Sequence, residues 1–446
     1  MQGRKRAVGF IFVPLLLLMV LPVWGGGRNE PQQEIIIGQW WAGWDADTFQ
    51  PVSDIDRQVL AHRRNMQSQL NIRMRENFIA SYGDYFPSMA ISIMSGEPNA
   101  SIYWVEPAWA LMMQRQGMVA PIVGNVNLGP AVPGDGRVDW DQTMMNAFSF
   151  EGQRYALSIS SHMQPLVLFF NKRLFREAGL DPELPYNMQR DRTWTWANLL
   201  PIARQLTRDI DGDGITDIWA FPRDPSTEFL DAVVSSNGAG YVGRDANGRF
   251  YNAIGSPEFL EALQFTLLLN DEGFMLPQPE GANWDWAYSA FSDGRVAMLV
   301  APMWARDLLQ TMTDDWGMVM FPMGPRVNDF VVFSMSHLLV IPSTFPSAKV
   351  ETIVTAVDMW FRPVDRSPYA WKDGLWHIFR DTRAIEETMV IVRDHRRGLA
   401  QYHRFIPGLE RGNIAWGMWY HEGDPSQLIE AVTPSWNAII MDANDF

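Results

Sequence analysis

The chain has 446 residues, of which 47% are hydrophobic and 20% charged, a balance typical of a globular protein with one large or two medium-sized domains. A net charge of −15, without a Lys/Arg-rich stretch beyond the N-terminus, argues against a nucleic-acid-binding surface. Because the chain has no cysteine, disulfides, thiolate zinc sites, cysteine nucleophiles and a lipid-bearing cysteine are excluded.

The N-terminus has the pattern of an export signal. The basic residues Arg4, Lys5 and Arg6 precede an apolar run at residues 7–24, and three glycines follow it. This order is typical of a secretory signal, so we interpret residues 1–27 as a signal segment. A membrane anchor is the alternative, because a run of this length nearly spans a bilayer. Either interpretation predicts an exported protein, periplasmic or attached to the outer face of the cytoplasmic membrane.

The next part of the chain alternates short strands with helices. Apolar, β-branched runs predict buried strands, whereas apolar residues at helical spacing predict helices. The expected strands are residues 34–38, 72–79 and 100–105, and the expected helices are 54–70 and 82–94. This alternation predicts an α/β fold with a largely parallel sheet.

The second half of the chain repeats the pattern with more helices. A strongly apolar strand is expected at 166–170, and Thr195 is placed to cap a helix over 196–206. Ser256 is placed to cap another helix that ends at Leu269. Further strands are expected at 296–300, 317–321 and 338–341, with helices over 350–360 and from 386 onward.

An acidic loop is the one candidate metal site, and it contains Asp209, Asp211, Asp213 and Asp217. Carboxylates at alternating positions around a glycine turn are the arrangement by which loops bind Ca²⁺. An EF-hand would need a glutamate where Ala220 stands, so the match is partial. Two interpretations stay open, a structural Ca²⁺ site and a solvated acidic turn. No other cofactor is expected to be required.

Candidate binding residues follow the first and third expected strands: Trp41, Trp44, Asp45, Glu106 and Trp109. Open parallel sheets bind ligands at the carboxyl ends of their strands. Indole faces there suit the C–H faces of sugar rings, although core packing is the alternative for each tryptophan. Glu106 could also be half of a glycosidase carboxylate pair, for which Asp45 is the one candidate partner.

Two Ser-His pairs also lie near strand ends, Ser161-His162 and Ser336-His337. Each histidine is placed to donate a hydrogen bond to a ligand, with a purely structural role as the alternative. No G-x-S-x-G, H-E-x-x-H or P-loop motif is present, which argues against the common hydrolase and nucleotidase classes.

Several motifs together resemble a known family. Residues 169–180 read FFNKRLFREAGL, and Thr195-Trp196 and an Asp-Gly-Asp-Gly loop follow them. Two further motifs belong to the same set: residues 291–298 together with Trp304, and residues 95–100, which contain Gly96 and Pro98. In this order the motifs resemble those of family 1 extracellular solute-binding proteins, the sugar-type receptors of ABC importers.

This resemblance implies a two-lobed periplasmic-binding-protein fold of the α/β class, with a ligand cleft between the lobes and multiple hinge crossovers. It implies an N-terminal lobe formed by residues 34–162 and 319–362, and a C-terminal lobe formed by 163–318 and 363–446. It further implies that ligand contacts come from Ser161, His162, Gly238, Trp304, Ser334, Ser336 and His337.

The expected function is capture of a mono- or oligosaccharide by a monomeric receptor, which hands it to an ABC permease and is not an enzyme. A secreted glycan-acting hydrolase is one alternative. A receptor for a non-sugar solute, such as a phosphodiester, is another. An anionic ligand would need an Arg or Lys clamp, and the expected cleft loops are poor in both.

Overall fold

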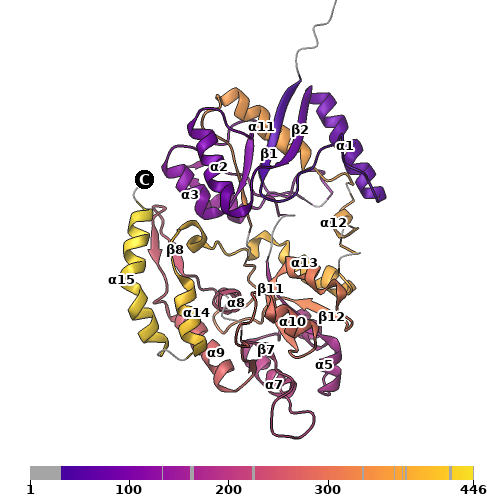
Figure 1. Cartoon of the computed structure of the whole chain (residues 1–446), viewed down its shortest axis with the longest axis vertical. Coiled ribbons are helices and arrows are strands. Elements are labelled where there is room, and N and C mark those ends of the chain that lie inside the picture. The colour runs from indigo at the N-terminus through magenta and orange to yellow at the C-terminus, as the bar shows by residue number, and fades with distance from the viewer. Residues whose placement is uncertain are drawn as a thin grey trace, which may run out of the picture.

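The computed structural model describes residues 32–132, 134–160, 165–223, 227–333, 336–365, 367–373, 375–376, 379–420 and 424–444. The chain forms two α/β lobes, one above the other in Figure 1. The expected signal segment lies outside the described residues. Within the described part, no helix is both long and apolar enough to cross a membrane.

The first lobe is built on a four-stranded sheet with the order β13-β3-β1-β2. Its central strand β1 (Gln33–Gln39) pairs in parallel with β2 (Ile72–Phe78) and with β3 (Ile102–Val105). The edge strand β13 (Leu338–Val340) comes from much later in the chain and runs antiparallel to β3. The predicted parallel arrangement of the first three strands is therefore confirmed.

Helices cover both faces of this sheet. Ile35 and Ile37 of β1 share one apolar core with residues of α1 (Asp54–Leu70) and α11 (Ser347–Trp360). Tyr103 of β3 belongs to a second core with residues of α2 (Tyr82–Met94) and α3 (Pro107–Arg115). Alternate strand residues thus face opposite layers, as strand geometry requires.

The second lobe has a three-stranded sheet in which β6 (Leu166–Asn171) lies between β11 (Met298–Pro302) and β12 (Trp316–Val319). Both neighbours run antiparallel to β6, so the expectation of a largely parallel sheet is wrong for this lobe. Alternation of strands and helices along a sequence does not fix strand direction, because a long connection can return the chain either way.

The remaining elements belong mostly to the second lobe. Its helices are α5 (Lys172–Glu177), α6 (Leu184–Arg190), α7 (Trp196–Leu206), α8 (Thr227–Ser236), α9 (Pro257–Asp271), α10 (Trp286–Ser292), α14 (Arg411–Tyr420) and α15 (Pro425–Ala443). Further helices and helical turns are α4 (Gln142–Ala147), η2 (Met303–Thr311), α12 (Ala370–Asp373), η3 (Ala384–Thr388), α13 (Met389–Val392), η4 (His395–Arg397) and η5 (Tyr402–Phe405). Two-stranded ribbons pair β4 (Ser149–Phe150) with β5 (Gln153–Arg154), β7 (Phe221–Pro222) with β10 (Met275–Leu276), and β8 (Val242–Arg244) with β9 (Phe250–Asn252).

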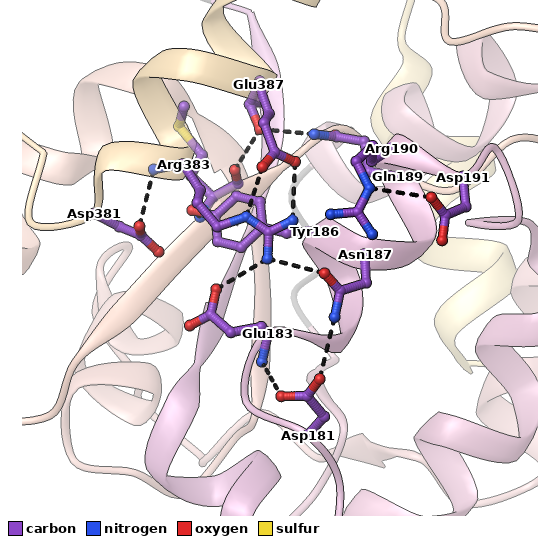
Figure 2. A network of polar contacts seen from close by, with 12 residues as sticks. Asp181, Glu183, Tyr186, Asn187, Gln189, Arg190, Asp191, Asp381, Arg383 and Glu387 are labelled. Atoms are coloured by element: carbon purple, nitrogen blue, oxygen red, sulfur yellow. Dashed lines mark hydrogen bonds and ion pairs between the residues drawn. The ribbon is translucent and has the colours of Figure 1, made fainter.

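A polar network fastens the C-terminal part of the chain to the second lobe (Figure 2). Arg383 donates hydrogen bonds to Glu183 at 3.2 Å, to Asn187 at 3.1 Å and to Glu387 at 2.6 Å, and its guanidinium lies over the Tyr186 ring. The segment that begins at η3 is therefore held against α6 before it continues toward the first lobe.

Candidate functional site

The candidate site lies at the carboxyl edge of the first-lobe sheet. Trp40 and Trp41 follow β1, and Glu106 follows β3 as the residue before α3. Because Leu338 of β13 pairs with Val105 of β3, the preceding residue His337 comes to lie beside Glu106. A ring nitrogen of His337 is 3.2 Å from the Glu106 carboxylate.

Glu106 is also the point at which a distant part of the chain reaches the site. Arg404 of η5 donates a hydrogen bond from Nη2 to Glu106 Oε2 at 3.1 Å. Burial raises the pKa of Glu106, but its hydrogen bonds and electrostatic interactions with His337 and Arg404 outweigh burial and leave this pKa below its ordinary value. Glu106 is therefore a charged hydrogen-bond acceptor at neutral pH.

Aromatic side chains surround this polar group. Trp40 packs edge-on against Trp41 at 4.8 Å, Trp109 at 5.6 Å and His337 at 5.0 Å between ring centroids. Trp41 stacks on His337 at 6.1 Å, and Tyr82 packs against Trp109 at 5.2 Å. The indoles of Trp40, Trp41 and Trp109 are only partly buried, so they present apolar surface beside the polar group.

The Tyr82 hydroxyl adds a further polar group at this site. Its side chain comes from the first turn of α2, and the residue is 54% exposed. Partial burial and the nearby Glu106 charge raise the pKa of Tyr82, while Arg404 lowers it less. The phenol therefore keeps its proton and can donate a hydrogen bond. Together, a carboxylate, a guanidinium, an imidazole, a phenol and three indoles suit a ligand with both hydroxyl groups and apolar faces.

A second contact between the lobes lies farther along the same edge. Asp139 of the first lobe accepts a hydrogen bond from Arg393 at 2.8 Å and lies 2.7 Å from a ring nitrogen of His395. The Arg393 guanidinium also lies over the Trp371 ring at 4.9 Å. These residues border an interlobe cavity of about 730 Å³, which is also lined by Arg137, Phe361 and Lys372.

The structure does not bring Trp44 and Asp45 into this group. After Trp41 the chain turns back along β2, and Trp44 exchanges backbone hydrogen bonds with Glu76. Trp44 packs on Trp360 at 5.2 Å and beneath the Arg63 guanidinium at 4.3 Å. Asp45 binds Arg73 at 3.0 Å, near the start of β2. Their surroundings are those of structural residues.

The other predicted residues are scattered. Ser336 is 1% exposed, and its hydroxyl donates to Asp141 at 3.2 Å within the first lobe. Gly238 follows α8 of the second lobe with φ +75°, a conformation that glycine adopts without strain. Trp304 lies in the first turn of η2 and packs against Tyr288 at 5.8 Å. Ser161, His162 and Ser334 lie outside the described residues.

Sequence reasoning missed three cationic residues of the site. Arg393, His395 and Arg404 come from the C-terminal segment, and nothing in their local sequence distinguishes them from ordinary surface residues. They contact carboxylates that lie some 250 to 300 residues earlier. The expected cleft loops contain few Arg and Lys residues, and the cations near the site come instead from a C-terminal segment that this expectation did not include.

The acidic loop brings three of its four aspartates together. Carboxylate oxygens of Asp209, Asp211 and Asp217 lie within 4.8 Å of one another, and Asp213 is not in this group. Hydrogen bonds from the backbone amides of Gly214 and Gly212 lower the pKa of Asp209. An all-oxygen set of charged ligands fits Ca²⁺. Metal binding at this loop stays a prediction.

Comparison with known proteins gives a family match and a shared fold. The family model for the bacterial extracellular solute-binding protein matches residues 77–344, more than half of the chain. No curated protein sequence matches the chain.

Solved structures resemble the whole molecule. The cyclic α-maltosyl-1,6-maltose binding protein of Arthrobacter globiformis is 14% identical with a TM-score of 0.66, over 92% of this chain and 99% of the other. The GacH receptor of Streptomyces glaucescens, solved unliganded and with acarbose, is 14% identical with a TM-score of 0.58, over 93% of this chain and 100% of the receptor. UgpB of M. tuberculosis, in complex with glycerophosphocholine, is 14% identical with a TM-score of 0.61, over 92% of this chain and 98% of UgpB. At this identity the likeness shows the two-lobed fold.

Proposed function

Because the chain belongs to the bacterial extracellular solute-binding protein family, we propose that it is an ABC-importer receptor that binds a carbohydrate between its two lobes. The observation that carries this proposal is the group formed by Glu106, His337 and Arg404, with the indoles of Trp40, Trp41 and Trp109 around it. The receptor acts outside the cytoplasmic membrane, as a monomer, and passes its ligand to a membrane permease.

A sugar ring matches this group in two ways. Its hydroxyls can donate to the Glu106 carboxylate and accept from Arg404, and each such charge-assisted bond is stronger than a neutral one. Its C–H faces are apolar and can lie against an indole face, where burial of apolar area adds to affinity. The relatives described with cyclic α-maltosyl-1,6-maltose and with acarbose support a carbohydrate as the ligand class.

Capture by hinge closure follows from the distribution of these groups over two lobes. Glu106 and the indoles belong to the first lobe, whereas Arg404 belongs to a segment that is fastened to the second. A ligand that contacts both sets stabilises the closed arrangement over an open one, and closure removes water from the site.

A glycan hydrolase is less well supported. Such an enzyme needs a carboxylic acid whose pKa is raised, paired with a second carboxylate across the scissile bond. The pKa of Glu106 is lowered instead, and Asp45 is bound to Arg73 near the opposite end of β2. The test is hydrolysis of chromogenic glycosides: release of dye that the Glu106→Gln variant loses would establish an enzyme and overturn the receptor proposal.

A phosphodiester receptor is the second candidate, and Arg404 favours it. Guanidinium groups bind phosphates well, and the relative UgpB is described with glycerophosphocholine. Here, however, Glu106 already neutralises Arg404 and would repel a phosphate placed beside it. Titration calorimetry of the protein with maltotetraose and with glycerophosphocholine separates the two candidates. Heat of binding with only glycerophosphocholine would overturn the carbohydrate proposal.

A further inference from the structure

Residues 393–405 contact both lobes beside the candidate site, and we name this segment the interlobe strap. It starts at the end of α13, which packs with η3, and Thr388 of η3 donates a buried hydrogen bond to the carbonyl of Met318 in β12. The Arg383 network in Figure 2 fastens the same region to α6. The start of the strap is thus fixed to the second lobe.

The middle of the strap is fixed to the chain that joins the lobes. The Val332 amide donates to the carbonyl of Arg397 at 2.8 Å, and the Leu399 amide donates to the carbonyl of Val332 at 3.1 Å. Val332 lies a few residues before β13, on the return of the chain from the second lobe to the first. The strap contacts the first lobe at two points.

One point of contact is largely apolar. Phe405 stacks on Phe148 of the first lobe at 5.8 Å with nearly parallel rings, and η5 packs along α3. Arg404 adds its buried ion pair with Glu106. Apolar contact with a desolvated ion pair holds independently of pH near neutrality, because neither group titrates there. This end of the strap lies on the side of α3 in Figure 1.

The other point of contact is polar. The Asp139 carboxylate forms ion pairs with Arg393 and His395. All three side chains lie beside the 730 Å³ cavity and keep about a fifth to a quarter of their surface exposed. A carboxylate–imidazole contact of this kind weakens when the histidine loses its proton. The two contacts of the strap therefore differ in kind, one permanent near neutral pH and one releasable.

We propose that the contact of Asp139 with Arg393 and His395 is a pH-sensitive latch between the lobes, in which these positioning residues set the open–closed equilibrium without touching the ligand. A protonated His395 completes the latch, and its deprotonation leaves Asp139 paired with Arg393. The proposal rests on hinge closure in the proposed function. It does not depend on which solute the cleft binds.

The surroundings of His395 support this assignment. The hydrogen bond and charge of Asp139 and the charge of Asp141 raise the pKa of His395, against burial and the positive charge of Arg393. Arg137, Lys372, Asp135, Asp365 and Asp394 line the same cavity. When the lobes separate, Asp139 withdraws and the pKa falls. Closure therefore takes up a proton: the latch is complete below the ordinary histidine pKa of about 6.5 and weakens as pH rises through the raised value.

The latch can be observed without any ligand. The chain has no cysteine, so Glu97→Cys in the first lobe and Gly255→Cys in the second provide two unique sites for a fluorescent donor and acceptor. Glu97 is exposed, and a side chain at Gly255 meets nothing within 4 Å. Energy transfer in the full chain, purified from cells that export it, should increase as the pH falls from about 8.5 to about 6.

Three variants make the test specific. His395→Gln should give a flat pH profile, and Asp139→Asn should lower energy transfer at every pH. Arg396→Gln is the matched control, because Arg396 lies on the same strap, is 88% exposed and pairs with Asp394 of the strap itself, so it should keep the original profile. Melting curves check that each variant folds. If Asp139→Asn does not fold, the pH profile of His395→Gln alone decides whether the latch exists.

A flat profile in the unsubstituted protein, or an unchanged profile in His395→Gln, would overturn the latch. Because the measurement uses no ligand, failure of a sugar to bind would leave this result unaffected. The two proposals can therefore fail separately.

Discussion

The carboxylate of Glu106 and the guanidinium of Arg404 lie 3.1 Å apart, although the two residues belong to different lobes and are separated by 298 positions in the sequence. Arg404 and Glu106 are both mostly buried, so each depends on the other to offset the loss of hydration. The pair joins the two lobes at the place where the indole side chains gather.

Replacing Glu106 tests this pair. In Glu106→Gln the buried Arg404 loses its counter-charge, and we expect the free energy of unfolding to fall by about 1–3 kcal/mol and sugar affinity to fall about tenfold or more. Urea unfolding and titration calorimetry measure the two effects. Glu97→Gln, at an exposed position in the turn after α2, is the control and should change neither quantity.

The same variant should also respond differently to acid from the original protein. The pKa of Glu106 is lower in the folded protein than its ordinary value, so Glu106 contributes stability above the ordinary pKa, and this is lost as pH falls through the lowered value. Glu106→Gln should therefore lose less stability than the original protein below about pH 4.5. Equal acid profiles would contradict the charge state assigned to Glu106.

Trp41 and Trp44 form a matched pair of tests, because both follow β1 and only Trp41 contacts His337. Trp44 is packed between Trp360 and the Arg63 guanidinium. Trp41→Ala should weaken sugar binding more than it lowers the melting temperature. Trp44→Ala should do the reverse, with a loss of about 3–5 kcal/mol in the free energy of unfolding. A loss of affinity confined to Trp44→Ala would reverse the assignment of the two indoles.

Thr388 tests how the strap is fixed to the second lobe. Its buried hydroxyl accepts a hydrogen bond from Gln189 at 2.9 Å and donates one to the Met318 carbonyl at 2.7 Å. Thr388→Val leaves both partners buried and unpaired, so we expect a loss of about 1–3 kcal/mol in chemical unfolding. Thr352→Val on α11 removes a hydroxyl that bonds only within its own helix and should cost much less.

The acidic loop makes the calcium prediction testable. If Asp209, Asp211 and Asp217 bind Ca²⁺, the melting temperature should rise with added Ca²⁺ and fall again with a chelator, because an ion that binds only the folded state stabilises it. Asp217→Asn should remove most of the response. Identical melting curves in Ca²⁺ and in chelator would leave the loop as a solvated turn.

Local signals predicted the helices well. The expected ranges 54–70, 82–94 and 196–206 are the bounds of α1, α2 and α7. Their ends are determined locally: Ser53 forms a capping box with Asp56, and the Thr195 hydroxyl accepts from the amide of Asn198. Such caps involve residues three positions apart, which a sequence displays directly.

The parts that sequence could not predict depend on distant contacts. The direction of β11 and β12 against β6 depends on the path of the long stretch of chain between Asn171 and Met298. Trp44 lies outside the candidate site because its backbone pairs with that of Glu76 in an isolated antiparallel bridge. Arg404 enters the site through the path of the strap, which no local pattern of charge or hydrophobicity encodes.

The central claim is that the protein captures a carbohydrate between its lobes, and the most direct measurement is a thermal-shift screen of the chain from Gln32 onward against mono- and oligosaccharides. A ligand at about one hundred times its Kd stabilises the folded state by about 2.7 kcal/mol, enough to raise the melting temperature measurably. We expect at least one sugar to raise it, and Glu106→Gln to reduce that rise. A uniform melting temperature across the sugars, alongside a clear rise with glycerophosphocholine, would contradict the claim.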